Sequence, residues 1–534
     1  MFATTIKKAT SMKRLLPLAC AALGALMSAA AQAAAPGITG PTFNLTAQTA
    51  YLSQPDGLSV YSWGYGCNGA PSGSAPAAIP LPSTGCPLMQ VPGPTLIVTE
   101  GQTVTVNLTN GLPTAAGNTS ILFPGFNVSA SGGVQGLLTT EAAPGGTVTY
   151  TFTASSPGTR AYYSGTQGDL QVEMGLYGAV IVLPSSVPSA CTGGIHASNR
   201  TAEMHWSESD FRLAAAAYDH AKTCYDREYL FQFSEIDPSI HKQALAQVSD
   251  PVRITACATS ATAPGCSLEV LTEPYHPAYF LVNGRSMPDD MDPNYAFEYP
   301  HQPYNGNPHM HPGELVLLRI IGQGRWQHPF HEHGNHVRIL GRDGNLILST
   351  DATQLAGPAL FTTTTTPGMA MDGIFYWTGK GLNWDAYGHN PASSDATAQL
   401  PCTPDSNGYN TSAPTAINYF EWCQDHNKPL QAMPFGDVAG GGPVALPDSN
   451  ILTNGAWYGG SPYLGPDATT RATGPTGTTP PSGTVANPPG SEAGFAFMWH
   501  SHNEREITTN NIFPGGMMMM MLVDSREFVI DESN

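Results

Sequence analysis

The chain has 534 residues, enough for more than one domain, and its formal net charge is −19. An acidic balance of this size argues against nucleic acid and anionic membrane surfaces as partners. Only 11% of the residues are charged, whereas the chain contains 57 glycines and 47 prolines. This composition is typical of an all-β protein with many turns and not of a helical bundle.

The first residues have the pattern of a bacterial secretory signal. Four bases precede an apolar run over residues 15–30, and "AQA" (31–33) supplies the small residues of a cleavage site. The run is short for a membrane span and no second one follows, so we expect no membrane span. We expect residues 1–33 to be a signal peptide and the mature protein to be secreted, either periplasmic or extracellular. The four bases are Lys7, Lys8, Lys13 and Arg14.

Alternating apolar and polar residues predict strands along the rest of the chain. Residues 92–113 alternate on both sides of "EGQ", as a hairpin does. A single short helix is suggested, over residues 210–221. Further strands are expected at 145–155 and 175–184, and then at 228–236, 278–284, 313–322, 336–348, 371–377, 494–502 and 515–524.

The strands fall into two groups, which predicts two β domains. We expect a first domain over residues 34–190, a connector over 191–227 and a second domain over 228–534. A stretch rich in Pro, Gly, Thr and Ser interrupts the second domain at about 378–493, and we interpret it as a surface insertion.

Eight cysteines follow the predicted signal peptide. An even number in an oxidising compartment indicates disulfides, although spacing alone leaves the connectivity open. None of the eight lies beside the histidine clusters, so thiolate metal ligation is not expected. Pairing of neighbours predicts Cys67–Cys86, Cys191–Cys224, Cys257–Cys266 and Cys402–Cys423.

Two pairs of histidines, each with a spacing of two, stand out near the end of the chain. They are His331 and His333 in "HPFHEHGNH" and His500 and His502 in "FMWHSHNERE". Side chains two apart on a strand point to the same face, so two such strands side by side bring four imidazoles together. Imidazole binds copper, zinc, iron and nickel, and we favour metal ligation over a polar rim.

Two other chemistries do not fit these motifs. His336 follows His331 by five residues, whereas the zincin helix requires four. Ser501 lies between two histidines, but they point to the opposite face of the strand and no nucleophile elbow surrounds it. A metalloprotease and a serine hydrolase are therefore disfavoured.

The motifs together resemble the multicopper oxidase family. "PGPTLIVTEGQTVTVNLTN" and "GLYGAVIV" are similar to its first domain, and "HPFHEHG" and "WHSHNERE" followed by "GGMM" are similar to its last domain. The resemblance implies an all-β fold of tandem cupredoxin-like Greek-key β-sandwiches, as in the two-domain branch. It also implies copper as the cofactor, and a homotrimer, because two-domain relatives form the copper cluster between subunits.

By resemblance, five histidines of the last domain occupy copper-ligand positions. The resemblance places His328 at type 1 copper, His331 at type 2 copper, and His333, His500 and His502 at type 3 copper.

Several other ligand positions carry different residues. Ser501 replaces the type 1 cysteine and Glu506 replaces the second type 1 histidine. In the first domain, all four ligand positions of the trinuclear cluster lack histidine. They are Leu122, Pro124, Tyr163 and Gly165.

The resemblance leaves three functional hypotheses open. The first is a secreted copper-binding protein with a reduced, mononuclear site and at most a modest oxidoreductase activity. The second is a non-catalytic structural or partner-binding module that has lost its metal. The third is a subunit that works beside an intact oxidase or an electron donor.

Three further motifs of the sequence give weaker indications of function. Met517 in "GGMMMMM" is either an axial copper ligand or, as we favour, a buried packing residue. His309 and His311 offer an accessory copper site, but we favour a solvated turn. Asp289, Asp290 and Asp292 form an acidic loop for which calcium binding is the less favoured interpretation.

Overall fold

The structure is a computed structural model. It describes residues 35–192, 208–380, 403–411, 421–422, 424, 460–464, 469–470, 485–486, 493–524 and 528–532. The predicted signal peptide, Cys402, Cys423 and most of the predicted insertion lie outside these ranges.

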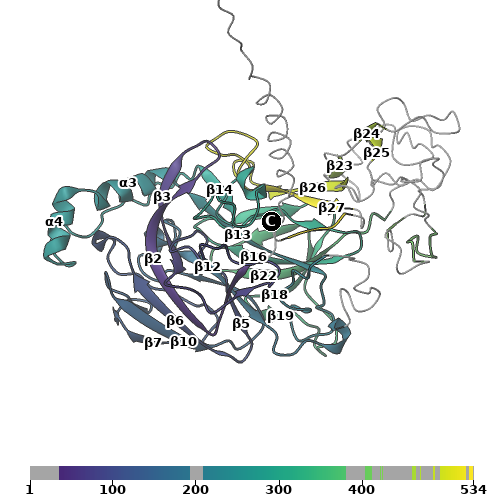
Figure 1. Ribbon diagram of the computed structural model, residues 1–534, viewed down its shortest axis with the longest axis horizontal. Coiled ribbons are helices and arrows are strands. Elements are labelled where there is room, and N and C mark those ends of the chain that lie inside the picture. Colours follow the sequence, from purple (N-terminus) through teal and green to yellow (C-terminus); the bar gives the residue numbers. More distant parts are fainter. Residues whose placement is uncertain are drawn as a thin grey trace, which may run out of the picture.

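Two five-stranded sheets form a first sandwich (Figure 1). Their orders are β11-β12-β5-β1-β4 and β3-β2-β6-β10-β7, and such non-sequential orders are typical of Greek-key sandwiches. Between the sheets lies an apolar core with fully buried Trp63, Tyr65 and Tyr150. The strands are β1 (Gly37–Thr39), β2 (Thr42–Ser53), β3 (Ser59–Cys67), β4 (Ser74–Ala75), β5 (Leu96–Thr99), β6 (Thr103–Asn110), β7 (Ser129–Gly132), β10 (Thr147–Thr153), β11 (Gly158–Tyr163) and β12 (Tyr177–Leu183), and a separate pair is formed by β8 (Val134–Gln135) and β9 (Thr140–Glu141).

The hairpin predicted over residues 92–113 is wrong, although both of its strands are present. β5 pairs in parallel with β1 and β12, whereas β6 pairs with β2 and β10 in the other sheet. The turn at Gly101, with a φ of 84°, therefore carries the chain from one sheet to the other. Alternation in sequence is compatible with either arrangement and does not identify the partner strand.

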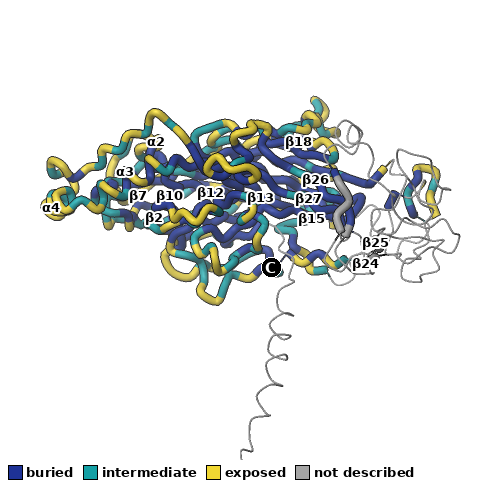
Figure 2. The backbone as a smooth tube through the Cα atoms, turned by 90° about the horizontal axis from the view of Figure 1, so that it is seen from above, coloured by how far each residue is buried: buried dark blue, intermediate teal, exposed yellow. Residues whose placement is uncertain are grey.

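A second sandwich contains a larger pair of sheets. One sheet has the order β14-β13-β16-β22-β18-β19 with β20 beside β18, and the other has the order β15-β27-β26-β17-β21 with β23 beside β26. Figure 2 shows the buried strands that form its centre. The strands are β13 (Arg227–Ile236), β14 (Tyr279–Val282), β15 (His309–Met310), β16 (Leu315–Gly322), β17 (His328–Glu332), β18 (Val337–Arg342), β19 (Asn345–Leu346), β20 (Ala359–Leu360), β21 (Thr362–Thr365), β22 (Ala370–Tyr376), β23 (Gly460–Leu464), β26 (Ala493–Ser501) and β27 (Met518–Asp524), and a further pair is formed by β24 (Thr469–Thr470) and β25 (Val485–Ala486). The predicted all-β fold of two tandem sandwiches is confirmed.

The two sandwiches pack through β11 and β12 of the first and β13, β16 and β22 of the second. An apolar cluster that includes Ala179, Leu230 and Ile321 joins them. Buried Asp372 adds polar contacts, because Thr159 donates to it from its backbone N at 3.0 Å and from its hydroxyl at 2.6 Å. Arg319, which is also buried, lies 3.4 Å from the same carboxylate. These contacts hold the first sandwich against the sheet that does not carry the histidine pairs.

The main helices lie between β13 and β14 of the second sandwich in sequence and were not predicted. α3 (Pro238–Val248) and α4 (Pro251–Thr259) each begin with an aspartate cap followed by proline, because Asp237 accepts from Ser239 N and Asp250 from Val252 N. The helix predicted over residues 210–221 is wrong, since that stretch forms bends instead. No helix among the described residues is long and apolar enough to cross a bilayer. The short helices are α2 (Gly168–Gln171) and the 3-10 turns η1 (Thr114–Ala116), η2 (Ser189–Cys191) and η4 (Asp289–Met291).

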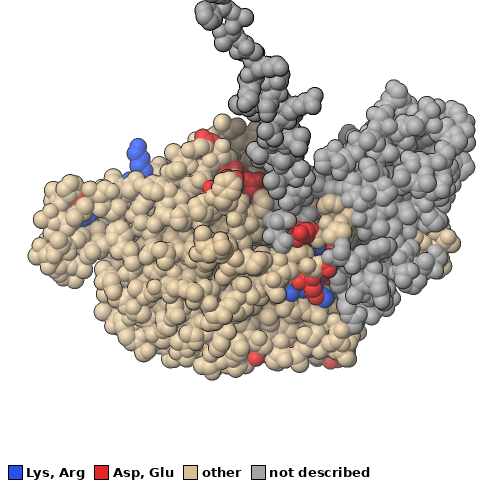
Figure 3. All heavy atoms as spheres, in the orientation of Figure 1, with Lys and Arg blue, Asp and Glu red and all other residues tan. Residues whose placement is uncertain are grey.

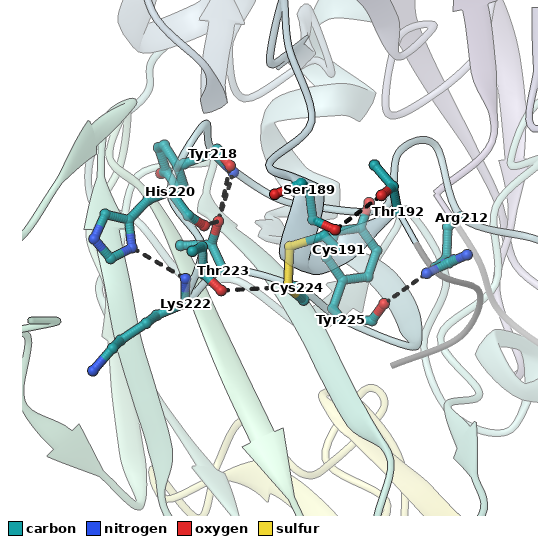
Figure 4. Close-up of a disulfide and its surroundings, with 11 residues drawn as sticks. Ser189, Cys191, Thr192, Arg212, Tyr218, His220, Lys222, Thr223, Cys224 and Tyr225 are labelled. Carbon is teal, nitrogen blue, oxygen red and sulfur yellow. Dashed lines mark hydrogen bonds between the residues drawn. A yellow bond between two sulfur atoms is a disulfide. The ribbon is translucent and has the colours of Figure 1, made fainter. Parts of the chain in front are cut away.

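Three of the four predicted disulfides lie within the described residues, and all three are confirmed. Figure 4 shows one of them, Cys191–Cys224, which closes a loop between the two sandwiches. The other two disulfides are Cys67–Cys86 and Cys257–Cys266. The fourth predicted pair lies outside the described residues and stays a prediction.

Figure 3 shows that charged side chains are sparse on the described part of the face in view, in keeping with the low charged fraction.

Candidate metal centre

The histidine pairs lie on two neighbouring antiparallel strands. β17 pairs with β26 in a register that sets His331 opposite His500 and Glu332 opposite Trp499. Because side chains alternate along a strand, His331 and His500 share the outer face of the sheet, whereas Trp499 points into the core. The structure therefore brings together the four histidines of the two H-x-H pairs.

The four imidazole rings form a compact group. Ring centroids are 4.7 Å apart for His331 and His333, 4.8 Å for His331 and His502, and 5.7 Å for His331 and His500. His500 lies 5.1 Å from His333 and 5.2 Å from His502. His502 is the most accessible member, with a side chain 46% exposed, whereas the other three are buried. An ion or a small molecule would therefore approach from the His502 side.

These distances fit the spacing that one metal ion requires. A metal–nitrogen bond of about 2.0–2.1 Å places a ring centroid about 3.2 Å from the ion, so two imidazoles on a tetrahedral ion have centroids about 5.2 Å apart. The nitrogens would then lie about 3.3 Å apart, and Nε2 of His333 lies 3.2 Å from Nε2 of His500. Among the described residues, however, no group of three or more His, Cys, Asp or Glu side chains is arranged to hold an ion as it stands. The rings are within reach of one ion, and binding would require some of them to turn.

The electrostatics favour the neutral form of two of the four imidazoles. Burial, followed by the charges of His502 and His500, lowers the pKa of His331 to about 4. Burial also lowers the pKa of His500. Neutral imidazole is the form that binds metal, so His331 and His500 do not have to lose a proton before binding at neutral pH.

Backbone carbonyls orient the ring of His500 and hold the two histidine strands together. His500 Nδ1 lies 2.7 Å from the carbonyl oxygen of Ser501, where it donates a proton and leaves Nε2 facing the cluster. Trp499 donates from its indole nitrogen to the carbonyl of His333 at 3.0 Å, which ties the two histidine strands together behind the rings. A hydrogen bond on the far nitrogen of a ligating histidine is a regular feature of metal sites.

His328, the fifth predicted ligand, lies apart from this group. It is three residues from His331, so its side chain points to the opposite face of β17, and it is fully buried. Its Nδ1 lies 2.9 Å from Glu506 and its Nε2 lies 2.9 Å from Glu235. Burial alone would lower the pKa of His328, but the hydrogen bonds and charges of the two carboxylates raise it to about 9. His328 is therefore an imidazolium held between two carboxylates.

The other residues that the resemblance assigns to type 1 copper belong to the same network. Ser501 donates from its hydroxyl to Glu506 Oε2 at 2.5 Å, and Asn503 donates to Glu506 Oε1 at 2.8 Å. Met517 is fully buried within the core of the second sandwich, in agreement with a packing role. Glu235 was missed by sequence reasoning, because it comes from β13 and nothing in the local sequence links it to His328.

The four residues of the first sandwich at which the resemblance leads one to expect histidines form an apolar patch held by backbone hydrogen bonds. Leu122 and Tyr163 are paired through their backbones, with Leu122 N donating to Tyr163 O at 2.7 Å. The side chain of Leu122 fills the space beside Gly165, where an added Cβ would lie 2.8 Å from Leu122 Cγ. Neither these residues nor Pro124 carries a nitrogen able to bind metal.

The H-x-H pair at residues 309–311 is not a solvated turn, so that prediction is wrong. His309 and His311 are buried. His309 Nδ1 lies 2.7 Å from Asp524, and His311 Nε2 lies 2.8 Å from Glu208. Each ring has its own carboxylate, because the segment runs beside β27 in the interior and not at the surface.

The acidic loop at 289–292 is partly buried and not fully exposed. Asp290 is fully buried in η4, and burial raises its pKa well above the usual range, although Arg285 acts in the opposite direction. Asp289 and Asp292 direct their backbone carbonyls to Arg285 at 3.3 and 2.9 Å. The guanidinium of buried Arg285 therefore supplies the positive charge in this loop.

Comparison with known proteins finds sequence matches for part of the first sandwich. Residues 89–187 match the family model described as "Multicopper oxidase". An L-ascorbate oxidase of Brassica rapa subsp. pekinensis is 38% identical over 96 residues, which are 17% of this chain and 16% of that protein. A laccase of Aspergillus fumigatus is 37% identical over 98 residues, which are 18% of this chain and 16% of the laccase. The matched segment thus spans about a sixth of the length of these relatives.

Solved structures of similar proteins cover more of the chain at low identity. A multicopper oxidase named mgLAC is 15% identical, with a TM-score of 0.43, over 90% of this chain and 86% of that protein. A blue copper oxidase from Nitrosomonas europaea is 14% identical, with a TM-score of 0.42, over 90% of this chain and 85% of that protein. The resemblance to the multicopper oxidase family is therefore confirmed for residues 89–187, the segment that matches its family model.

Proposed function

We propose that this chain is a copper-binding protein of multicopper oxidase type with one mononuclear site, formed by His331, His333, His500 and His502. The observation that carries the proposal is the group of four rings, in which the centroids of neighbouring rings are 4.7 to 5.7 Å apart. Bound copper would supply one-electron redox chemistry, and the chain would supply the imidazole ligands. The proposal leaves out His328, whose two nitrogens both face carboxylates.

The proposed oxidoreductase activity is modest at most. Ser501 cannot replace the thiolate through which type 1 copper receives electrons rapidly. The first sandwich offers Leu122, Pro124, Tyr163 and Gly165 at the positions where the family places histidines. A trinuclear cluster within one chain would lack half of its ligands, so reduction of oxygen to water by the chain alone is not part of this proposal.

We also propose the predicted processing and domain division. Residues 1–33 would be a signal peptide that directs the chain to the periplasm or the medium. Domains would span 34–190 and 228–534, joined by the connector 191–227, with the insertion at about 378–493 belonging to the second domain. The three described disulfides suit an oxidising compartment.

Copper titration of the purified mature protein tests the site. Isothermal titration and elemental analysis should find one copper per chain, and His500→Ala should abolish this binding. His336→Ala is the matched control, because His336 is exposed and lies outside the four-ring group on the same stretch of chain. Copper binding that survives His500→Ala, or that is lost equally in both variants, would contradict the assignment.

A second candidate function is a non-catalytic, partner-binding module. It is favoured by the absence of a ready-made metal cage among the described residues and by the apolar patch at Leu122. Absence of metal after copper loading would support it.

A homotrimer, or a complex with an intact oxidase or an electron donor, would add ligands from another chain. Light scattering on the purified protein tests the trimer, and a monomer at micromolar concentration would exclude it.

A further inference from the structure

A run of threonines lies along the histidine strand. β21 (Thr362–Thr365) pairs with β17 in a register that sets Thr362 opposite His331, Thr364 opposite Pro329 and Thr365 opposite His328. Each threonine therefore stands beside one residue of "HPFH". The run forms the wall of the histidine cluster on the side away from β26.

Three of these hydroxyls contact the histidine strand. Thr362 Oγ1 lies 2.9 Å from Nδ1 of His331. Thr363 donates to the carboxyl group of Glu332, and Thr365 donates to the carbonyl of His328 at 3.3 Å. Thr364 is exposed, and its hydroxyl has no hydrogen bond with any described residue. Of the four, only Thr362 reaches an imidazole nitrogen.

The contact with Thr362 determines which nitrogen of His331 faces the cluster. A neutral imidazole carries one proton, and a metal binds the nitrogen that lacks it. When Nδ1 holds the proton and donates it to the threonine oxygen, Nε2 is left as the ligand atom. His500 shows the same pattern, with Nδ1 directed to the carbonyl of Ser501.

We infer that Thr362 is a positioning residue, which holds His331 in the Nδ1–H tautomer and presents Nε2 to the metal. This inference rests on the proposed copper site for its functional meaning, but the tautomer itself is a property of the metal-free chain. Partners of this kind typically change metal affinity by about 10- to 100-fold when they are removed. The inference thus assigns a role to one residue of the threonine run, a segment that the family motifs do not include.

The test compares three variants of the mature protein. Thr362→Val keeps the shape of the side chain and removes the hydroxyl. Thr362→Ser keeps the hydroxyl, and Thr364→Val makes the same change on the same face of the strand at an exposed position. The first readout is the ring tautomer of His331 in metal-free protein, from nitrogen-15 NMR. The second is the copper dissociation constant, measured by competition with a chelator, together with the paramagnetic resonance spectrum.

The wild type, Thr362→Ser and Thr364→Val should show the Nδ1–H tautomer, and Thr362→Val should lose this preference. Copper affinity should fall about 10- to 100-fold in Thr362→Val alone, with altered nitrogen hyperfine coupling. An unchanged tautomer in Thr362→Val would overturn the inference whether or not copper binds. Absence of copper binding by the wild type, with the tautomer effect present, would instead refute the proposed function and leave the positioning contact established.

Discussion

The buried imidazolium of His328 should make the stability of the second sandwich depend on pH. Its pKa is about 9 in the folded protein and about 6.5 in an unfolded chain. A group whose pKa is raised on folding stabilises the protein fully below the unfolded value, and this stabilisation is lost as the pH rises through the folded value. The difference corresponds to about 3 kcal/mol in the free energy of unfolding, since one pKa unit is worth about 1.4 kcal/mol.

Most of this contribution should disappear between pH 7 and pH 10. Linkage with these two pKa values gives about 2.5 kcal/mol at pH 7 and almost nothing at pH 10. The comparison protein is the double variant His328→Gln, Glu506→Gln, which removes one cation and one anion together. Glu235 keeps its backbone donors there, from Arg325 N at 2.7 Å and Trp326 N at 2.9 Å.

Urea denaturation at a series of pH values, followed by tryptophan fluorescence, measures the effect. From pH 7 to pH 10 the wild type should lose about 2.5 kcal/mol more than the double variant. Glu332, whose pKa is raised to about 8 by burial, is present in both proteins, so its titration cancels in the difference. Parallel curves for the two proteins would refute the assignment of His328 as a cation held by Glu235 and Glu506.

Other features of the structure lead to further expected outcomes. Protein loaded with Cu(II) should show no intense blue band and no type 1 signal in paramagnetic resonance, because Ser501 offers a hydroxyl in place of a thiolate; an intense charge-transfer band would contradict this. Turnover of phenolic laccase substrates should stay near background, and oxygen consumption that copper restores after chelation would show otherwise. Arg227→Met should destabilise the protein by about 3 to 5 kcal/mol, because it leaves buried Glu208 and Glu314, now 2.6 and 2.7 Å from the guanidinium, without their cation; a thermal melt unchanged from wild type would exclude this. Non-reducing mass spectrometry should find all cysteines of the mature chain oxidised, and free thiol at any of the six that form the described disulfides would disagree with the structure.

Local patterns predicted the strands well and their partners poorly. Alternation located both β5 and β6, yet their assignment to different sheets depends on long-range pairing that alternation does not encode. The helix expected at residues 210–221 rested on an alanine run, and tertiary contacts override such weak preferences. The signals for α3 and α4 were present, because Asp237 and Asp250 each precede a proline, and capping reasoning would have found them.

The candidate site shows the same division between local and long-range information. The spacing of His331 and His333, and of His500 and His502, was enough to place two rings on one face of each strand. Adjacency of β17 and β26 then brought the pairs together, which the sequence indicated only through resemblance. The contact of Thr362 with His331 required the strand register, and a threonine run by itself carries no such information.

The residues that the resemblance assigns to type 1 copper form a complete hydrogen-bonded network without a metal. His328 is buried, and a buried polar group without partners would be costly. Glu506 faces one ring nitrogen of His328 and accepts from both Ser501 and Asn503, while Glu235 faces the other ring nitrogen. A thiolate introduced by Ser501→Cys would therefore compete with two carboxylates for one imidazole, and breaking either pair would leave a buried charge behind. In the adjacent four-histidine group, by contrast, Nε2 of His500 and Nε2 of His333 are directed toward one another at 3.2 Å.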